Sequence, residues 1–147
     1  MSRVLAVDWG TRRLGLAISD PTGALARPLP ILQVSSSEGA ARGVVEAAAR
    51  EGARSILVGL PLLPSGSEGA SAREARRLGD SLRARGLDVT FADERWSTED
   101  AKLHAMEHGE KRGPKGRLDQ LAAVILLQSY LDSRAATARE PGESDHA

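Results

Sequence analysis

The stretch from Val4 to Asp20, VLAVDWGTRRLGLAISD, constrains the fold more than any other part of the chain. Two apolar runs flank a short basic turn, a pattern that predicts two strands joined by a tight connection. Asp8 stands where the first run stops. An ionised carboxylate beside a buried strand needs a compensating cation, because an unpaired buried charge costs several kcal/mol. A metal ion or a nearby arginine would meet that need.

The turn itself allows two interpretations. Gly10 and Gly15 remove side chains on either side of it, which would let a phosphate or a metal-bound oxygen come close to the backbone. Arg12 and Arg13 add positive charge there. In the first interpretation the turn belongs to a ligand site. In the second it is an ordinary hairpin in which Asp8 hydrogen-bonds its own backbone and both arginines are solvated.

The size and charge of the chain exclude several classes of protein. Its 147 residues suit one domain, and twenty Lys plus Arg balance twenty Asp plus Glu, so binding of nucleic acid or membrane would need local patches. There is no cysteine, which excludes disulfides and thiolate metal sites. The sequence shows no leader-like start and no apolar run long enough to cross a bilayer, so we expect a cytoplasmic protein.

Downstream of the opening strands, apolar periodicity and chain breakers predict the order strand, helix, strand, helix, strand, helix, helix. The expected ranges are 23–34, 40–50, 55–61, 70–85, 88–94, 97–108 and 118–134. The run 55–61 is apolar without alternation, which is typical of a central strand parallel to the first. The run 23–34 carries two prolines, which suit an edge strand. Ser67 and Glu68 could cap the helix that starts at residue 70.

Three antiparallel strands followed by alternating helices and strands indicate an α/β fold with a mixed five-stranded sheet. We expect residues 1–134 to form a single domain. The segment 135–147 is polar and contains Pro141 and Gly142, so it is expected to form a disordered tail that buries too little apolar surface to order itself.

Carboxylates follow the ends of two predicted parallel strands. Asp8 ends one strand, while Asp93 and Glu94 end another, and ligands of such sheets collect at the carboxyl ends of the strands. Asp119 opens the predicted terminal helix and has Ala122 one turn further along the same face, so that face could approach the sheet closely. Mg²⁺ and Mn²⁺ prefer oxygen ligands, and a two-metal phosphodiesterase site needs several carboxylates. Together these acids could supply such a site.

Each acid also has a structural interpretation. Asp119 could simply stabilise the first turn of a helix, and Glu94 could pair with Arg95 or cap the next helix. His104 and His108 have the spacing of two ligands on a helix, but no third ligand is nearby in the sequence. The absence of cysteine and of a partner for either histidine favours a metal-activated water as nucleophile.

A basic segment precedes Asp119 and is the clearest positive patch in the chain. It reads KRGPKGR from Lys111 to Arg117 and is bounded by helix breakers, so we expect a flexible loop. Lys111, Arg112 and Lys115, together with the arginines of the first turn, are candidates to contact a phosphate backbone without reading its sequence. The loop 66–69 could also cradle a phosphate at a helix N-terminus, although such loops usually only turn the chain.

Several separated segments match one known pattern. They are DWGTRRLGLAISD from Asp8, VGLP from Val58 with GSEG from Gly66, DER from Asp93 followed by Ser97-Thr98, and DQLAAVILLQSYL from Asp119. With these segments the chain resembles the YqgF family of Holliday-junction resolvases, which have a ribonuclease H-like fold of three layers. The resemblance implies a metal-dependent nuclease linked in bacteria to maturation of pre-16S rRNA during ribosome biogenesis.

Carried over to this chain, the resemblance places Asp8, Glu94 and Asp119 on the family's acidic positions, as catalytic residues and as ligands of Mg²⁺ or Mn²⁺. Asp93 could replace Glu94 as a ligand, and Trp9 fills a variable position. The resolvase activity on branched DNA is the alternative function. A non-catalytic RNA-binding assembly factor is another, and the segment from Asp8 also resembles the phosphate loop of actin-like ATPases, which need a second lobe. The choice between RNA and DNA stays open, as do the cleavage mode, the number of ions and the oligomeric state.

Overall fold

The structure is a computed structural model that describes residues 3–10, 12–93 and 114–138, with the side chains of the last helix described from 121 to 136. Its elements follow the chain order β-β-β-α-β-α-β-α. Their bounds are β1 Arg3–Asp8, β2 Arg13–Ser19, β3 Ala26–Gln33, α1 Ser37–Glu51, β4 Ala53–Leu60, α2 Ala70–Ala84, β5 Asp88–Asp93 and α4 Pro114–Ala138. None of the described helices has the length and apolar character needed to cross a bilayer.

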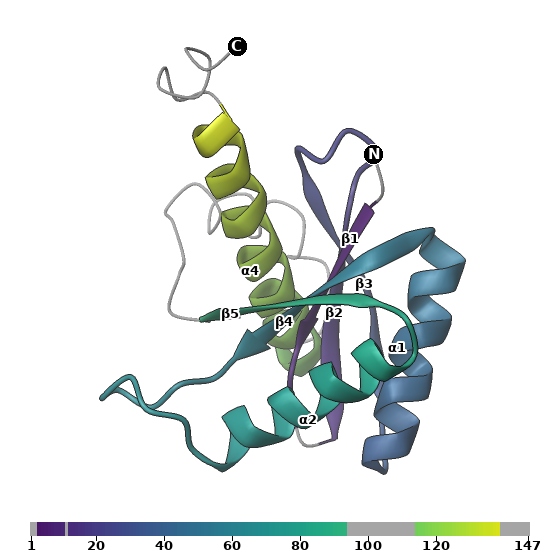
Figure 1. Cartoon of the computed structure of the whole chain (residues 1–147), viewed down its shortest axis with the longest axis vertical. Helices are drawn as coiled ribbons and strands as arrows, with labels where there is room; N and C mark the ends of the chain where they lie inside the picture. The colour runs from purple at the N-terminus through teal and green to yellow at the C-terminus, as the bar shows by residue number, and fades with distance from the viewer. Residues whose placement is uncertain (1–2, 11, 94–113, 139–147) are drawn as a thin grey trace.

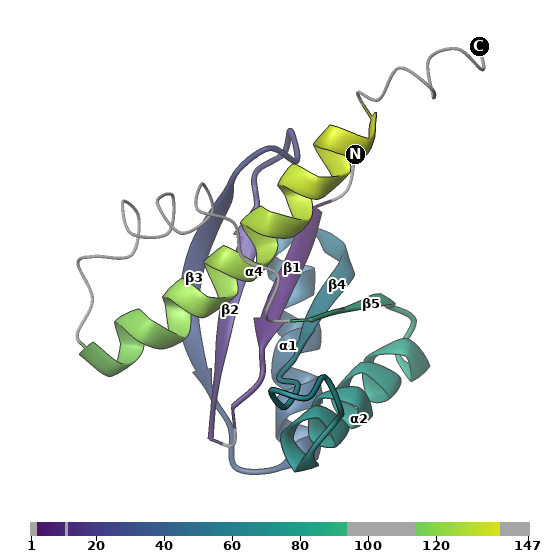
Figure 2. The same ribbon diagram turned by 90° about the vertical axis from the view of Figure 1, so that its left-hand side faces the viewer.

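The five strands form one mixed sheet in the order β3-β2-β1-β4-β5. The first three strands are antiparallel neighbours, while β1, β4 and β5 run parallel. Helices α1 and α2 cover one face and α4 crosses the other (Figures 1 and 2). The predicted α/β architecture, the central parallel position of β4 and the edge position of β3 are therefore confirmed.

The two faces of the sheet bury different kinds of side chain. The face under α1 and α2 holds larger residues, among them Leu5, Val7 and Ile56. The face under α4 holds smaller ones, such as Ala6 and Ala17, and the helix packs on them through Ala123, Val124, Leu127 and Leu131. Small residues let the helix backbone come close to the sheet. This explains why β1 and β4 are apolar without alternation, because both of their faces are buried.

A buried glutamine ties α4 to the hairpin between β2 and β3. Gln128 is 5 % exposed, and its Oε1 accepts a hydrogen bond of 2.8 Å from the backbone N–H of Ala26. Its Nε2 donates to the carbonyl of Ala24 and to Oδ1 of Asp132, both at 2.9 Å. The contacts to the hairpin join residues more than a hundred positions apart, so they fix the helix against the edge of the sheet.

The edge strand β3 carries Pro28 and Pro30, which contribute no backbone N–H to a neighbouring strand. Helix α1 follows it and begins at a serine cap, where Oγ of Ser36 accepts a hydrogen bond of 3.0 Å from the N–H of Gly39. That cap satisfies one of the free donors of the first turn.

The predicted start of the last helix was wrong. Helix α4 begins at Pro114, not near residue 118, and continues through Ala138, four residues into the segment expected to be a tail. Proline is well tolerated in the first turn of a helix, where its missing N–H has no partner to lose. Lys115 therefore lies in the helix and not in a loop, and Asp119 lies in the second turn. The helix expected over 97–108 and the tail after residue 138 lie outside the described residues.

The predicted cap of α2 was also wrong. The N-cap is Gly69, which has no side chain to accept a hydrogen bond. The loop before it uses its polar groups internally, since the N–H of Leu63 bonds the carbonyl of Ser67 at 2.9 Å. The carboxylate of Glu68 binds Arg76, eight residues further along the chain. Nε of Arg76 donates a hydrogen bond of 2.8 Å to each oxygen of Glu68.

Candidate functional site

Asp8 is the last residue of β1, at the centre of the sheet. Side chains alternate along a strand, and Val4 and Ala6 belong to the core under α4. Asp8 therefore lies on the α4 face, at the edge where the parallel strands end. The structure places this predicted site residue where ligands of open α/β sheets bind.

The residues beside Asp8 on both neighbouring strands are glycines, which have no side chain. On β2 the cross-strand partner of Asp8 is Gly15. On β4 the adjacent residue is Gly59, which follows the pair Val7–Val58. Side-chain alternation puts both glycines on the face of Asp8. The Asp8 carboxylate is a hard oxygen ligand of the kind that a divalent cation prefers, and glycine on both neighbouring strands adds no side chain beside it. This feature becomes clear only once the strands are paired.

Of the other two predicted acids, only the backbone of Asp119 belongs to the described residues. The backbone of Asp119 lies in the N-terminal part of α4, and those turns lie toward the same end of the molecule as the C-terminal end of β1 (Figures 1 and 2). The side chain of Asp119 and the whole of Glu94 lie outside the described residues. Among the described residues alone, no group of three acids or histidines could hold a metal ion.

Asp93, the alternative ligand, is the last residue of β5. Val89 and Phe91 belong to the core under α1 and α2, whereas Ala92 belongs to the core under α4. By alternation Asp93 lies on the α1 and α2 face, opposite to Asp8. The sheet lies between these two carboxylates, which does not favour a shared ion.

The turn after Asp8 is held by backbone contacts. The carbonyl of Arg12 accepts a hydrogen bond of 2.9 Å from the N–H of Val34, just beyond the end of β3. A Cβ atom at Gly10 would collide with the carbonyl oxygen of Arg13, so only glycine fits that position without a shift of the turn. The side chain of Arg12 is exposed, while that of Arg13 is half-buried at the start of β2. Lys111 and Arg112 lie outside the described residues, as does the side chain of Lys115.

A hollow on the other face was missed by the sequence reasoning. It lies between the N-terminal ends of α1 and α2, has a volume of about 410 Å³ and is lined in part by Trp9, Ser36 and Glu74. Trp9 follows Leu5 and Val7 on the α1 and α2 face, so its side chain points away from the face that carries Asp8. The sequence alone does not indicate whether Trp9 lines a hollow beside α1 and α2 or lies in a solvent-exposed turn.

The loop 66–69 is not an open phosphate cradle. The N–H of Gly66 bonds the carbonyl of Leu63 at 2.8 Å, which closes the turn on itself. The hydrogen bond from Arg76, together with its charge, outweighs desolvation and lowers the pKa of the Glu68 carboxyl below its ordinary value. An anionic side chain at this position disfavours a phosphate beside it.

Comparison with known proteins agrees with this geometry. The sequence profile of the RuvX family, described as a Holliday junction resolvase, matches residues 2–133. The chain belongs to the RuvX family. The resemblance to the YqgF family, another name for the same group, is thereby confirmed.

Two relatives of RuvX type cover nearly the whole chain. A protein of Anaeromyxobacter sp. (strain Fw109-5), named provisionally as a pre-16S rRNA nuclease, is 40 % identical over 136 residues, which make up 91 % of this chain and 99 % of that protein. A protein of Rubrobacter xylanophilus with the same name is 40 % identical over 132 residues, 88 % of this chain and 92 % of its own.

Solved structures share the fold. The RuvC protein of Thermus thermophilus in complex with a Holliday junction superposes with a TM-score of 0.61 at 17 % identity, and covers 93 % of this chain and 98 % of that one. The fowlpox virus resolvase bound to junction DNA gives a TM-score of 0.57 at 14 % identity, and covers 90 % and 98 %. The ribonuclease H-like, three-layer fold expected from the sequence is confirmed.

Proposed function

We propose that this RuvX protein is a divalent-metal-dependent nuclease that hydrolyses phosphodiester bonds in pre-16S rRNA, at its 5′ end, in the cytoplasm. The observation that carries the proposal is the position of Asp8. It ends the central strand, on the α4 face, and its neighbours on the two adjacent strands are Gly15 and Gly59. Membership of a family of nucleases and resolvases supports the same reaction class.

Asp8, Glu94 and Asp119 would hold Mg²⁺ or Mn²⁺, in a two-ion arrangement. When bound, the ions supply a nucleophilic water and stabilise the leaving oxygen. Of the three, Asp8 would be the most firmly held ligand, because the hydrogen bonds of β1 to both of its neighbouring strands fix its backbone. Asp93 lies on the face of the sheet opposite to Asp8, which favours Glu94 as the metal ligand at the end of β5.

The substrate backbone would be positioned by basic residues at the same edge. Arg12 is exposed in the turn after Asp8, and Arg13 begins β2. We extend the interface to Lys111, Arg112 and Lys115, which precede Asp119 in the sequence. These side chains would contact phosphates and sugars and would carry little sequence information.

The alternative substrate is branched DNA. It is favoured by the two structural neighbours that are complexes with Holliday junctions, whereas the relatives with higher sequence identity are named for pre-16S rRNA. Because the relatives named for pre-16S rRNA have the higher sequence identity to this chain, we favour RNA as the substrate. A contact to the 2′-hydroxyl would separate the two substrates, because only RNA carries this group.

The test compares both substrates in one assay. The purified protein is incubated with an RNA that carries the 5′ end of pre-16S rRNA and with a four-way DNA junction, in Mg²⁺ or Mn²⁺, with and without a chelator. We expect cleavage of the RNA that the chelator abolishes and added Mg²⁺ restores. Cleavage that persists in the chelator would contradict the metal mechanism. Binding of the RNA without cleavage in either metal would favour the assembly-factor alternative.

Replacement of Gly10 by alanine tests the geometry of the turn. The new methyl group collides with the Arg13 carbonyl, so the turn must shift and carry Asp8 with it. We expect a loss of about 1–3 kcal/mol in unfolding free energy, as for other overpacked sites, and a lower rate of RNA cleavage. The control is Gly69→Ala, whose Cβ meets only ordinary contacts of 3.4–3.5 Å with Leu63. Equal cleavage by both variants would show that the turn does not position Asp8.

A further inference from the structure

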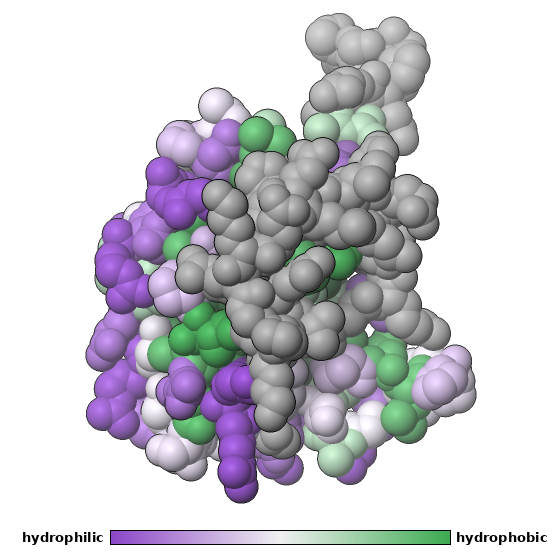
Figure 3. Space-filling view, turned by 180° about the vertical axis from the view of Figure 1, so that it is seen from behind, coloured by the Kyte–Doolittle hydropathy of each residue, from purple (hydrophilic) through white to green (hydrophobic). Residues whose placement is uncertain are grey.

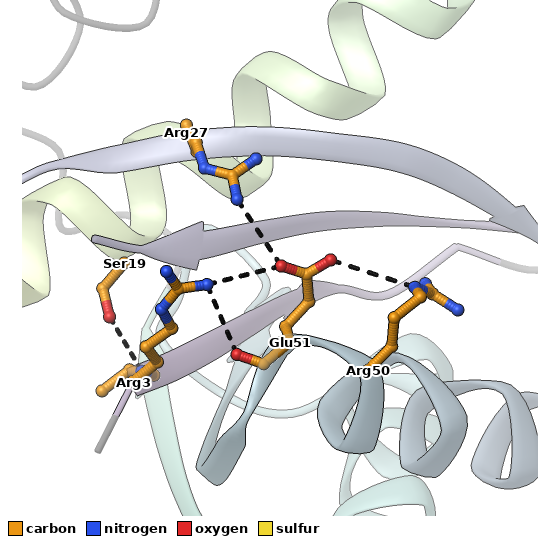
Figure 4. Close-up of polar contacts among 6 residues, drawn as sticks. Arg3, Ser19, Arg27, Arg50 and Glu51 are labelled. Carbon is orange, nitrogen blue, oxygen red and sulfur yellow. Dashed lines mark hydrogen bonds and ion pairs between the residues drawn. The ribbon is translucent and has the colours of Figure 1, made fainter. Parts of the chain in front are cut away.

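Three arginines from three elements surround one carboxylate at the C-terminal end of α1 (Figure 4). Nη1 of Arg3 and Nη2 of Arg27 each lie 3.5 Å from Oε1 of Glu51. Nε of Arg50 lies 3.9 Å from Oε2 of the same residue. Arg3 also donates a hydrogen bond of 3.4 Å to the Glu51 carbonyl. We call Arg3, Arg27, Arg50 and Glu51 the arginine cluster.

The arginine cluster has more positive charge and more donors than its carboxylate can satisfy. Three guanidinium groups face one carboxylate, and each guanidinium has five N–H donors. The pairs are loose compared with the pair of Arg76 and Glu68, in which the distances are 2.6–2.8 Å and both oxygens are used. The carbonyl end of α1 adds at most about half a negative charge, part of which Arg3 and the N–H of Gly52 already offset, so the arginine cluster keeps a positive excess.

The free donors are open to solvent. The side chains of Arg27 and Arg50 are 54 % and 63 % exposed, whereas that of Glu51 is 17 % exposed. An approaching anion therefore meets guanidinium groups before it meets the carboxylate. Seen from the α4 side, hydrophilic residues line the margin of the molecule that α1 forms (Figure 3).

The arginine cluster lies away from the proposed metal site at Asp8. Arg3 and Asp8 are the first and last residues of β1, so about 17 Å of strand separates their backbones. Alternation places them on opposite faces of the sheet. Arg27 belongs to the edge strand β3, which a long ligand could cross on its way from one face to the other.

We propose that the arginine cluster binds phosphate groups of the nucleic-acid backbone away from the proposed metal site, as a second anchor for a long substrate. This rests on the proposed nuclease function. The planar fork of arginine matches the oxygens of a phosphate and forms two parallel hydrogen bonds with it. Such contacts add affinity and carry no base sequence.

The test removes two charges from the arginine cluster in the full-length protein. Arg27→Gln/Arg50→Gln is compared with Arg42→Gln/Arg73→Gln, which removes two exposed arginines elsewhere on α1 and α2. Affinity for a labelled single-stranded RNA, long enough to span both ends of the sheet, is measured by fluorescence anisotropy at several salt concentrations without divalent metal. Each lost phosphate contact lowers the slope of log affinity against log salt by about 0.7.

We expect the cluster variant to lower that slope by about 1.4, the single variant Arg50→Gln to lower it by about 0.7, and the control pair to leave it near the wild-type value. Equal slopes for the cluster variant and the wild-type protein would overturn the proposal, as would equal losses in both double variants. A cluster variant that binds inorganic phosphate more weakly but binds the RNA with unchanged affinity and salt dependence would also overturn it, because the arginine cluster would then bind free anions and not the RNA backbone. Circular dichroism verifies that each variant is folded.

The outcome is separable from that of the proposed function. Binding is measured without metal, so a protein that never cleaves RNA can still show the expected change of slope. Conversely, chelator-sensitive cleavage of an RNA too short to reach the arginine cluster should be unchanged in the cluster variant. A loss of that short-substrate cleavage would show that the substitutions act on the proposed metal site and would contradict a separate anchor.

Discussion

Asp8→Asn is expected to abolish metal-dependent cleavage of RNA. Asparagine keeps the shape of the side chain and removes the charge that would hold the ions. Substitution of groups that only support metal ligands already costs 10–100-fold, so loss of a metal ligand itself should lower the rate by more than about 100-fold. The measurement is the initial rate of cleavage at saturating Mg²⁺, for wild-type and variant proteins of matched purity.

The control for this experiment is Asp88→Asn. Asp88 is an exposed aspartate at the first residue of β5, at the opposite end of the parallel strands. The substitution Asp88→Asn removes the same charge as Asp8→Asn, but far from the proposed metal site, so it should leave the cleavage rate unchanged. The unfolding free energy of Asp8→Asn should not fall, because neutralising one member of a group of acids relieves repulsion. Full activity of Asp8→Asn would defeat the proposed site and favour a binding protein.

A second pair of variants separates the two acids that follow β5. Because Asp93 lies on the face opposite to Asp8, Asp93→Asn should retain most of the activity, whereas Glu94→Gln should lose it. The rates are measured as for Asp8→Asn. The reverse result would exchange the roles of the two acids.

Gln128→Ala is expected to cause the largest loss of stability. It leaves the buried N–H of Ala26 without its acceptor and removes the tie between α4 and the hairpin. A buried group without a partner costs about 1–3 kcal/mol, and the lost packing adds to this, so we expect a decrease of about 2–4 kcal/mol. Urea unfolding measures it as a lower midpoint with an unchanged slope.

Two controls accompany Gln128→Ala. Gln33→Ala replaces an exposed glutamine at the end of β3 and should change the unfolding free energy by less than about 0.5 kcal/mol. Asp132→Ala removes only the contact within α4 and should have an intermediate effect. If Gln128→Ala unfolds at the same midpoint as Gln33→Ala, then apolar packing alone holds α4 in place.

The order of strands could be predicted because the residues of each strand indicate whether its faces are buried and whether it lies at an edge of the sheet. Continuous apolar runs in β1 and β4 indicate two buried faces, and the prolines of β3 indicate an edge. The position of Asp8 at the end of a central strand was predictable for the same reason. These properties depend on residues close together in the chain.

Other features could not be predicted, because they depend on contacts between distant residues. Nothing near Gln128 shows that its partners lie on a hairpin more than a hundred residues away. Gly15 and Gly59 lie on either side of Asp8 only once both strands are placed beside β1. The start of α4 was misplaced because Pro114 and Gly116 were interpreted as breakers, although proline suits a first turn and packing on the sheet offsets the cost of the glycine.

The prolines of β3 also affect how these molecules behave at high concentration. Exposed edge strands invite strands of other molecules to pair with them, and this is a common start of aggregation. A strand that approached β3 would find no N–H at Pro28 or Pro30. The long edge of the sheet is therefore protected against growth into larger assemblies, and replacing both prolines by threonine should make the protein precipitate at lower concentrations.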